Sequence, residues 1–142
     1  MFNLDDCLAF ITNKRSKLLA EALENEFRPY QITRSQWIAM FFIFNYDALT
    51  QKELADKMGI KEPSVVRLIQ KLELSGLLHR SETLEDKRIK QLQLSSKGVN
   101  VYHELLPIAE NFKKHTVQGI SEEDLQTFKH VLETMTKNTI KE

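Results

Sequence analysis

The apolar residues of this chain change their spacing in one central segment, between residues 77 and 95, and this change constrains the fold more than any other feature. On either side of that segment they recur every three or four residues, which is the period of amphipathic α-helices. In residues 77–80 and 91–95 they instead alternate with polar residues, most clearly in QLQLS, as in strands with one buried face. The charged run TLEDKRIK lies between these two stretches. The sequence therefore predicts a β-hairpin with a solvated tip in an otherwise helical protein.

Helical spacing covers most of the remaining chain. The first helix is long and amphipathic and ends at Pro29, because proline cannot continue a helix. The second contains WIAMFFIF, which is apolar almost all round, as in a core helix that other helices surround. Two more helices follow the hairpin, with a kink expected at Pro107. These helices are expected to run from about Leu4 to Phe27, from Thr33 or Ser35 through residue 44, from Ser95 or Ser96 to at least Phe112, and from Ser121 to about Lys137.

Two short helices are predicted just before the hairpin, and they meet at Gly59. Thr50 and Glu53 form a T-x-x-E capping box that starts the first of them. Pro63 suits the first turn of the second, which Gly76 then terminates.

The residues around Gly59 match the spacing of a helix-turn-helix motif. Small Ala55 lies where the two helices must approach closely, and the turn glycine lets the chain change direction sharply. The buried contacts between the helices are expected from Ile60, Val65 and Leu68. Two helices fixed at a steep angle can place the second one in the major groove of DNA, which is wide enough for one helix.

On this interpretation the outward face of the second helix contacts DNA. That face carries Lys61, Ser64, Arg67 and Lys71. Arginine can form two hydrogen bonds with a guanine edge, whereas lysine or serine can bond phosphates or bases. Arg67 is therefore the expected base reader.

The distribution of charge supports this interpretation more than the total charge does. The chain has 20 basic and 20 acidic residues, so its net charge favours no class of partner. Residues 61–97 carry eight Lys or Arg against five Asp or Glu, a balance of +3. In the hairpin tip, Asp86 precedes Lys87, Arg88 and Lys90 and would orient Arg88 through a charge-assisted hydrogen bond. A basic tip of this kind suits insertion into the minor groove of A·T-rich DNA.

The segment from residue 50 to residue 98 closely resembles the multiple-antibiotic-resistance repressor (MarR) family of winged-helix regulators. The resemblance rests on EPSVVRLIQKLELSGLLHR, on the EDKR that follows it and on LQLSSKG. Asp86 and Arg88 match the family's wing pattern, and Ser95 replaces its usual threonine before Gly98. ITRSQW and the helices at both ends extend a looser likeness over nearly the whole chain.

The resemblance implies a mainly α fold with a small β-hairpin, in which N- and C-terminal helices form a dimerisation region around a winged helix-turn-helix. Residues 1–142 would form a single domain. Dimerisation helices would occupy about 1–32 and 100–142, and the DNA-binding lobe about 33–98.

The resemblance also implies that the protein is a sequence-specific transcriptional regulator, expected to be a repressor, which binds double-stranded DNA as a homodimer. A recognition helix at about 62–75 would enter the major groove of a pseudo-palindromic operator, and a wing at about 80–92 the minor groove. The residues expected to contact DNA are Lys61, Ser64, Val65, Arg67, Lys71, Asp86, Lys87, Arg88 and Lys90.

The chain ends favour a homodimer independently of the resemblance. Both terminal helices carry an apolar stripe. The two stripes together present more apolar surface than one small core can bury. In the final helix the stripe consists of Leu125, Phe128, Val131, Leu132 and Met135.

The family resemblance further implies a small-molecule effector, often aromatic or amphipathic and anionic, bound where the dimerisation helices meet the DNA-binding lobe. Phe10, Trp37 and Phe41 are the candidates to line such a crevice, although aromatic residues in apolar helices more often belong to the core. The effector would weaken DNA binding only through its different affinity for the two states of the protein.

Two alternatives remain open. The first is a redox-sensing repressor, in which peroxide oxidises the Cys7 thiolate to sulfenic acid. Leu8 follows Cys7 where the peroxide-sensing branch of the family has an aromatic residue, so a buried, inert thiol is the favoured interpretation. The second is a winged-helix module that binds another protein and reads no operator.

Other classes of function find no support in the sequence. The four histidines include no pair at the spacing of a helical metal site, and neither a phosphate-binding glycine loop nor a nucleophile motif occurs. We therefore expect no metal, no cofactor, no catalytic residues and no enzymatic activity. The longest apolar run is too short to span a membrane. The single cysteine and the absence of a secretory leader favour a cytoplasmic protein.

Overall fold

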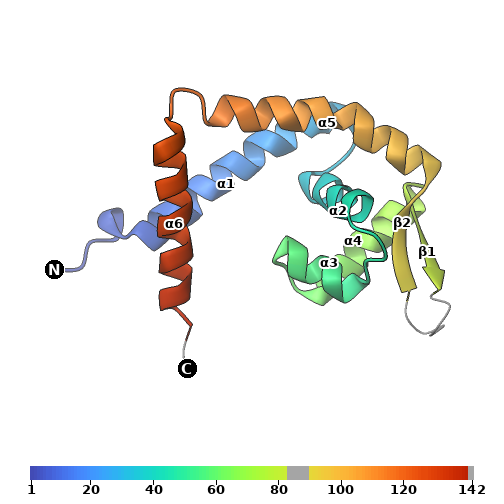
Figure 1. Ribbon diagram of the computed structural model, residues 1–142, viewed down its shortest axis with the longest axis horizontal. Coiled ribbons are helices and arrows are strands. Elements are labelled where there is room, and N and C mark those ends of the chain that lie inside the picture. Colours follow the sequence, from blue (N-terminus) through green and yellow to red (C-terminus); the bar gives the residue numbers. More distant parts are fainter. Residues whose placement is uncertain (83–89, 141–142) are drawn as a thin grey trace. The chain divides into compact units, whose positions relative to one another are not determined.

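The computed structural model describes residues 1–82 and 90–140 of the chain. The chain divides into two compact units, Met1–Ile108 and Ala109–Glu142. The first unit contains the helix-turn-helix, the hairpin and the buried core, and the second contains the end of one long helix and the last helix. The predicted mainly α fold with a β-hairpin is confirmed (Figure 1).

The helices and strands follow the predicted order along the chain. Short 3-10 turns, Leu4–Asp6 and Arg28–Tyr30, precede and follow the first helix. The longer elements are α1 (Leu8–Phe27), α2 (Arg34–Asn45), α3 (Gln51–Met58), α4 (Glu62–Leu74), β1 (Leu78–Glu82), β2 (Lys90–Leu94), α5 (Ser96–Thr116) and α6 (Glu122–Asn138).

The connection between α1 and α2 is set by local sequence signals. α1 ends at Phe27, and Pro29 lies in the 3-10 turn that follows, which confirms the predicted helix end. α2 starts after Thr33, not Ser35. Thr33 Oγ1 accepts a hydrogen bond from the Gln36 amide at 3.0 Å, and Gln36 Oε1 accepts one from the Thr33 amide at 2.9 Å. These reciprocal bonds form a capping box that fixes the start of the core helix.

The core of the first unit is built around α2. The Trp37 ring stacks on Tyr102 of α5, with centroids 5.5 Å apart and planes at 14°, and lies 5.6 Å from Phe27 at the end of α1. Met40 is fully buried. Phe44 departs from the prediction, since it is 39% exposed at the last turn of α2, where its ring packs on Tyr102 at 4.6 Å. The WIAMFFIF helix is therefore the core element, but its end faces solvent.

The hairpin has the predicted alternation of buried and exposed residues. β1 and β2 pair antiparallel, with Leu78 opposite Leu94 and His79 opposite Gln93. The leucines of this pairing are buried and the polar residues exposed. The Leu92 amide also donates a hydrogen bond to the Leu49 carbonyl at 2.8 Å, which attaches the hairpin to the loop before α3.

The first strand starts at Leu78 and not at the predicted residue 77, because residue 77 lies in the turn between α4 and β1. The Gly76 amide donates to the Glu73 carbonyl at 3.0 Å, and the Leu77 amide donates to the Leu72 carbonyl at 2.9 Å. These bonds form the Schellman arrangement that closes a helix, and Gly76 adopts the left-handed φ of +73° that it requires. Leu77 therefore belongs to the turn that closes α4 and not to the strand.

The start of α5 packs tightly against this turn. Ser95 Oγ accepts a hydrogen bond from the Gly98 amide at 3.0 Å, so Ser95 is the cap that the sequence left open between two serines. A Cβ atom on Gly98 would overlap the Leu77 carbonyl oxygen and lie 3.0 Å from the carbonyl carbon. Position 98 therefore has room only for glycine. α5 continues through Pro107 as one helix.

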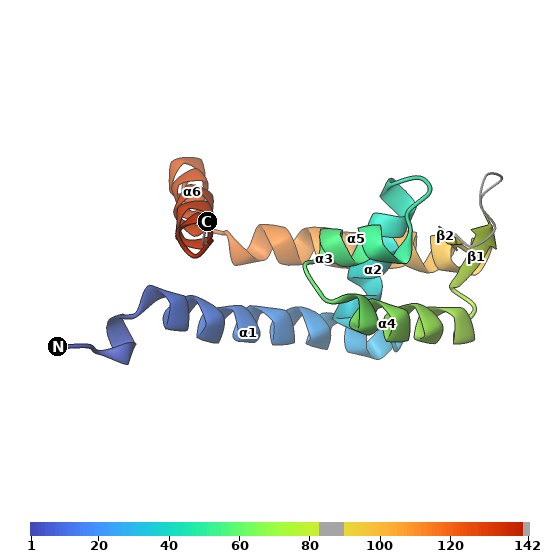
Figure 2. The same cartoon turned by 90° about the horizontal axis from the view of Figure 1, so that it is seen from below.

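The terminal helices keep most of their apolar residues uncovered within the chain. α6 is capped by Ser121, as predicted, and contains no buried residue. Phe128 and Val131 of its stripe are 57% and 41% exposed. In α1, Phe27 is buried, whereas Leu8, Leu18 and Leu19 are exposed, and Figure 2 shows the first part of α1 extending past the helix-turn-helix lobe.

Among the described residues, no helix combines the length and the apolar character that crossing a membrane requires.

Candidate nucleic-acid interface

The helix-turn-helix predicted around Gly59 is present. Thr50 Oγ1 accepts a hydrogen bond from the Glu53 amide at 3.2 Å, and Glu53 Oε1 accepts one from the Thr50 amide at 3.3 Å, which starts α3 as predicted. Gly59 ends α3 with a left-handed φ of +69°. Ala55 is 4% exposed, as expected for the close approach of two helices. The capping box, the turn glycine and the small residue at the close approach of the helices are therefore present as predicted.

α4 has a buried side and an exposed side. The buried residues are Val65, Leu68, Ile69 and Leu72. Of the predicted DNA contacts, Lys61, Arg67 and Lys71 are exposed and Ser64 is half-buried. Because residues three and four positions apart share a helix face, Ser64, Arg67 and Lys71 lie together. The structure thus presents a polar, basic helix face to solvent.

Two predicted positions on this motif need correction. The sequence assigns Val65 both to the buried contacts between the helices and to the DNA contacts. Its side chain is 0% exposed, which confirms the burial and shows that it does not reach the exposed face. Ile60 is predicted to be buried, but it is 38% exposed. The Ile60 amide donates to the Ala55 carbonyl at 3.1 Å, which places it in the turn closing α3, outside the contact between the helices.

Gln70 is an exposed residue of α4 that the sequence interpretation missed. It lies three residues after Arg67, and glutamine can form two hydrogen bonds with an adenine edge. Gln70 is uncharged, so the pattern of basic residues does not include it. Its spacing from Arg67 is the signal that would have found it.

The hairpin predicted to form the wing is present, but its tip lies outside the described residues. Asp86, Lys87 and Arg88 belong to that tip. For Lys90 the structure describes the backbone, which pairs with Glu82 at the end of the hairpin. DNA contacts by these residues stay predictions.

The exposed face of α4 also forms one wall of a pocket of about 420 Å³. The opposite wall consists of Glu24 from α1 and of the first turn of α2. Glu24 Oε2 accepts a hydrogen bond from the Arg34 amide at 3.0 Å, which joins α1 to the start of α2. The lining residues are Glu24, Thr33, Ser35, Gln36, Ile60, Ser64, Arg67, Leu68 and Lys71. The basic residues of α4 therefore border both the solvent and a ligand-sized space.

The aromatic residues predicted to line an effector site do not line this pocket. The ring centroids of Trp37 and Phe41 lie 6.1 Å apart, and both rings pack against the Tyr102 ring in the core. Phe10 is in the first turn of α1, and a rise of about 1.5 Å per residue places it roughly 25 Å from Phe27, the residue that contacts Trp37. The described chain therefore does not bring Phe10 to the other two.

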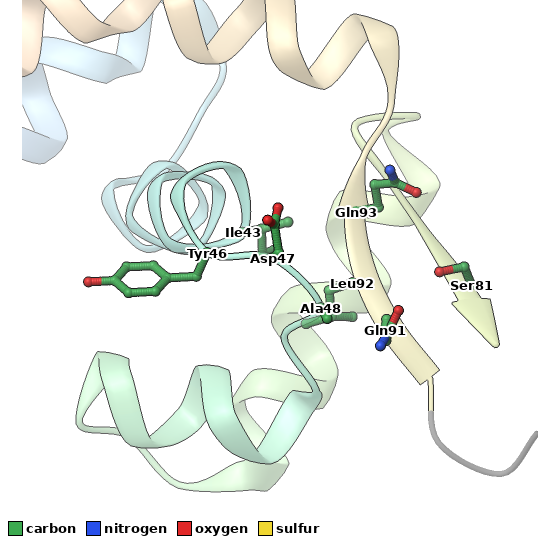
Figure 3. A pocket seen from close by; sticks show the side chains of 8 residues that line it. All are labelled: Ile43, Tyr46, Asp47, Ala48, Ser81, Gln91, Leu92 and Gln93. Atoms are coloured by element: carbon green, nitrogen blue, oxygen red, sulfur yellow. The ribbon is translucent and has the colours of Figure 1, made fainter. Parts of the chain in front are cut away.

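A smaller pocket lies between the α2–α3 loop and the hairpin (Figure 3). Its volume is about 120 Å³, and Asp47, Gln91 and Gln93 are among the side chains around it. Ligand sites usually measure roughly 300 to 1,000 Å³. This pocket suits a few water molecules better than an effector.

Cys7 is a free, half-buried cysteine at the residue that precedes α1. A free thiol at this place is compatible with both the inert and the redox-sensing interpretations. The redox hypothesis stays a prediction.

Comparison with known proteins agrees with this geometry. The sequence profile of the MarR family matches residues 32–90, which include α2, the helix-turn-helix and the start of β2. An uncharacterized HTH-type transcriptional regulator of Bacillus subtilis (strain 168), YwoH, is 27% identical over 119 residues, which cover 84% of this chain and 86% of YwoH.

Solved structures share the fold over most of the chain. The S. aureus MepR–DNA complex has a TM-score of 0.85 at 22% identity and covers 93% of this chain and 98% of MepR. CouR from Rhodococcus jostii RHA1, bound to p-coumaroyl-CoA, has a TM-score of 0.83 at 17% identity and covers 100% of both chains. The profile match over residues 32–90, the relative YwoH and the shared winged-helix fold together make this chain similar to the MarR family of transcriptional regulators.

Proposed function

We propose that the protein is a homodimeric repressor that binds a pseudo-palindromic operator and is released by a small molecule. The observation that carries this proposal is the exposed face of α4, with Ser64, Arg67 and Lys71 on one side of a helix whose other side is fixed in the core. A helix held in this way can present side chains to base edges without bending. The fold that this chain shares with MepR, solved as a DNA complex, supports α4 as the recognition helix.

A homodimer would cover the apolar faces that the chain leaves open. The unit Ala109–Glu142 has no buried residue in α6, and an isolated helix with a half-exposed apolar stripe gains little stability by itself. The exposed leucines of α1 offer a second such face. A two-fold dimer would pair these helices and set two copies of α4 on successive major grooves.

The experiment that tests the function is selection of duplexes from a random pool by the purified protein. We expect enrichment of a sequence with two inverted half-sites whose centres lie about one helical turn, or a multiple of it, apart. A single unpaired half-site would contradict the dimer, and no enrichment at all would contradict sequence-specific binding.

We place the effector in the pocket beside α4, not among the aromatic residues of the core. Its volume of about 420 Å³ is in the range of small-molecule sites. Arg67 and Lys71 would hold an anionic group there, while Leu68 and Ile60 supply apolar contact. A ligand bound to these cations would compete with DNA for them, which gives the different affinities that release requires.

Small aromatic carboxylates, beginning with benzoate, are therefore expected to displace the selected duplex in a fluorescence anisotropy titration. Ser35 lines the pocket from α2, opposite the α4 face. The Ser35→Trp variant should fill the space and lose this response while its affinity for the duplex stays near the wild-type value. Equal displacement from Ser35→Trp and wild type would show that the effector binds elsewhere.

A further inference from the structure

Arg80 connects three elements of the winged helix through one side chain. It is the third residue of β1, opposite Leu92. Its Nε and Nη2 atoms donate hydrogen bonds to Glu73 Oε1 of α4 at 3.0 and 2.8 Å. Its Nη1 atom donates to Gln51 Oε1, at the start of α3, at 3.0 Å. The guanidinium therefore contacts both helices of the helix-turn-helix and belongs to the first strand of the hairpin.

These bonds occupy the Arg80 guanidinium with partners within the protein. The guanidinium carries five N–H donors, and Glu73 and Gln51 take bonds from all three of its nitrogen atoms. The side chains of Arg80 and Glu73 are 28% and 34% exposed, so the ion pair is partly sheltered from water. Charge-assisted bonds with more than one contact fix geometry as well as contribute energy. Arg80 thus differs from a basic surface residue that is free to meet a phosphate.

The segment that Arg80 bridges is the turn between the recognition helix and the wing. Ser75, Gly76 and Leu77 alone separate α4 from β1, and Gly76 has a left-handed backbone. The backbone bonds of this turn hold Gly76 and Leu77 themselves, and the Arg80 side chain adds a second connection, from β1 directly to α4 and α3. The contact between Arg80 and Glu73 lies across this turn and holds its two sides together.

We propose that Arg80, held by Glu73 and Gln51, is a positioning residue that sets the angle between the wing and the recognition helix for DNA binding. This inference rests on the proposed function, since the angle matters only if both elements meet DNA together. A duplex contacted by a helix in one groove and a hairpin in the next requires both at fixed places. Arg80 acts on DNA through the placement of these elements.

The Glu73→Ala variant gives the sharpest test, because the positioning role and simple electrostatics predict opposite signs. Loss of an acidic side chain near a polyanion should strengthen binding if charge alone matters. If Glu73 holds Arg80 in place, binding of the selected duplex should instead weaken, by about tenfold. Glu73→Gln keeps an acceptor oxygen and should recover most of this loss.

Glu62→Ala is the matched control, since Glu62 is an exposed acid at the other end of α4. It should leave the affinity unchanged or raise it. Arg80→Lys keeps the charge but not the planar set of donors, so we expect the same loss as for Arg80→Ala. A phosphate contact would be largely preserved by lysine.

Folding is checked by circular dichroism and thermal melting. If Glu73→Ala melts below the assay temperature, the comparison of Arg80→Lys with Arg80→Ala decides the question. If wild type binds the selected duplex and Glu73→Ala and Arg80→Lys bind it as tightly, the positioning role is wrong while the proposed function stands. If wild type enriches no duplex, the proposed function itself is wrong.

Discussion

Replacing Arg67 with alanine is expected to cost roughly 1 to 3 kcal/mol of binding free energy for the preferred duplex and to relax the base preference at one position per half-site. Arg67 is exposed on α4, while its neighbours Leu68 and Ile69 fix the helix in the core. A guanidinium on a fixed helix can form two hydrogen bonds in the plane of a guanine, and alanine can form neither. The measurement is titration of the preferred duplex, followed by a second selection with the variant.

Lys71→Ala is the matched control for Arg67→Ala. Lys71 is an exposed cation one turn further along the same face of α4. A lysine contact with a phosphate carries no sequence information, so its loss should weaken all duplexes about evenly and reduce the slope of affinity against salt by about one. If Arg67→Ala weakens the preferred and the scrambled duplex equally, Arg67 is not the base reader.

Of the four glycine-to-alanine substitutions possible in this chain, Gly98→Ala is expected to cause the largest loss of stability. The new Cβ would overlap the carbonyl oxygen of Leu77 and approach its carbon to 3.0 Å. That carbonyl already accepts a hydrogen bond from the Ser95 amide at 3.0 Å, so the turn has little freedom to move away. Overpacking against backbone should lower the free energy of unfolding by about 3 kcal/mol or more. The corresponding fall in Tm is roughly 10 °C.

Gly59→Ala separates this overlap from the general cost of replacing a glycine. Gly59 has a left-handed φ of +69°, but no atom lies within 4 Å of its added Cβ. Its substitution should therefore cost only the backbone strain of about 1 to 2 kcal/mol. Thermal melts of both variants give the comparison. A loss at Gly59 that equals or exceeds the loss at Gly98 would contradict the explanation by overlap.

The parts of the fold that the sequence predicted are those set by residues close together in the chain. The Thr50–Glu53 capping box and the turn at Gly59 are complete within ten residues, and both formed as predicted. Thr33, and not Ser35, caps α2, because the Gln36 side chain accepts a hydrogen bond from the Thr33 amide. Local signals of this kind predict the structure well, because few other groups compete for the unpaired N–H and C=O groups at helix ends.

The parts that the sequence could not predict join residues far apart in the chain. Glu24 of α1 and Arg67 of α4 line the same pocket, and the Arg80 contacts reach back to Gln51. The aromatic residues chosen for an effector site looked equivalent by composition. The structure places them apart, since Trp37 packs in the core and Phe10 lies at the far end of α1. Which apolar residue is core depends on tertiary contacts that no local pattern encodes.

The measurement that most directly tests DNA as the partner of this protein is a titration of the selected duplex and a scrambled duplex of equal length at two salt concentrations. If each dimer neutralises about six or more phosphates, affinity for the selected duplex should fall roughly a thousandfold or more between about 50 and 200 mM salt. The scrambled duplex should bind more weakly at both concentrations. No binding of either duplex at the lower salt concentration would contradict the account and indicate a winged-helix module that binds another protein.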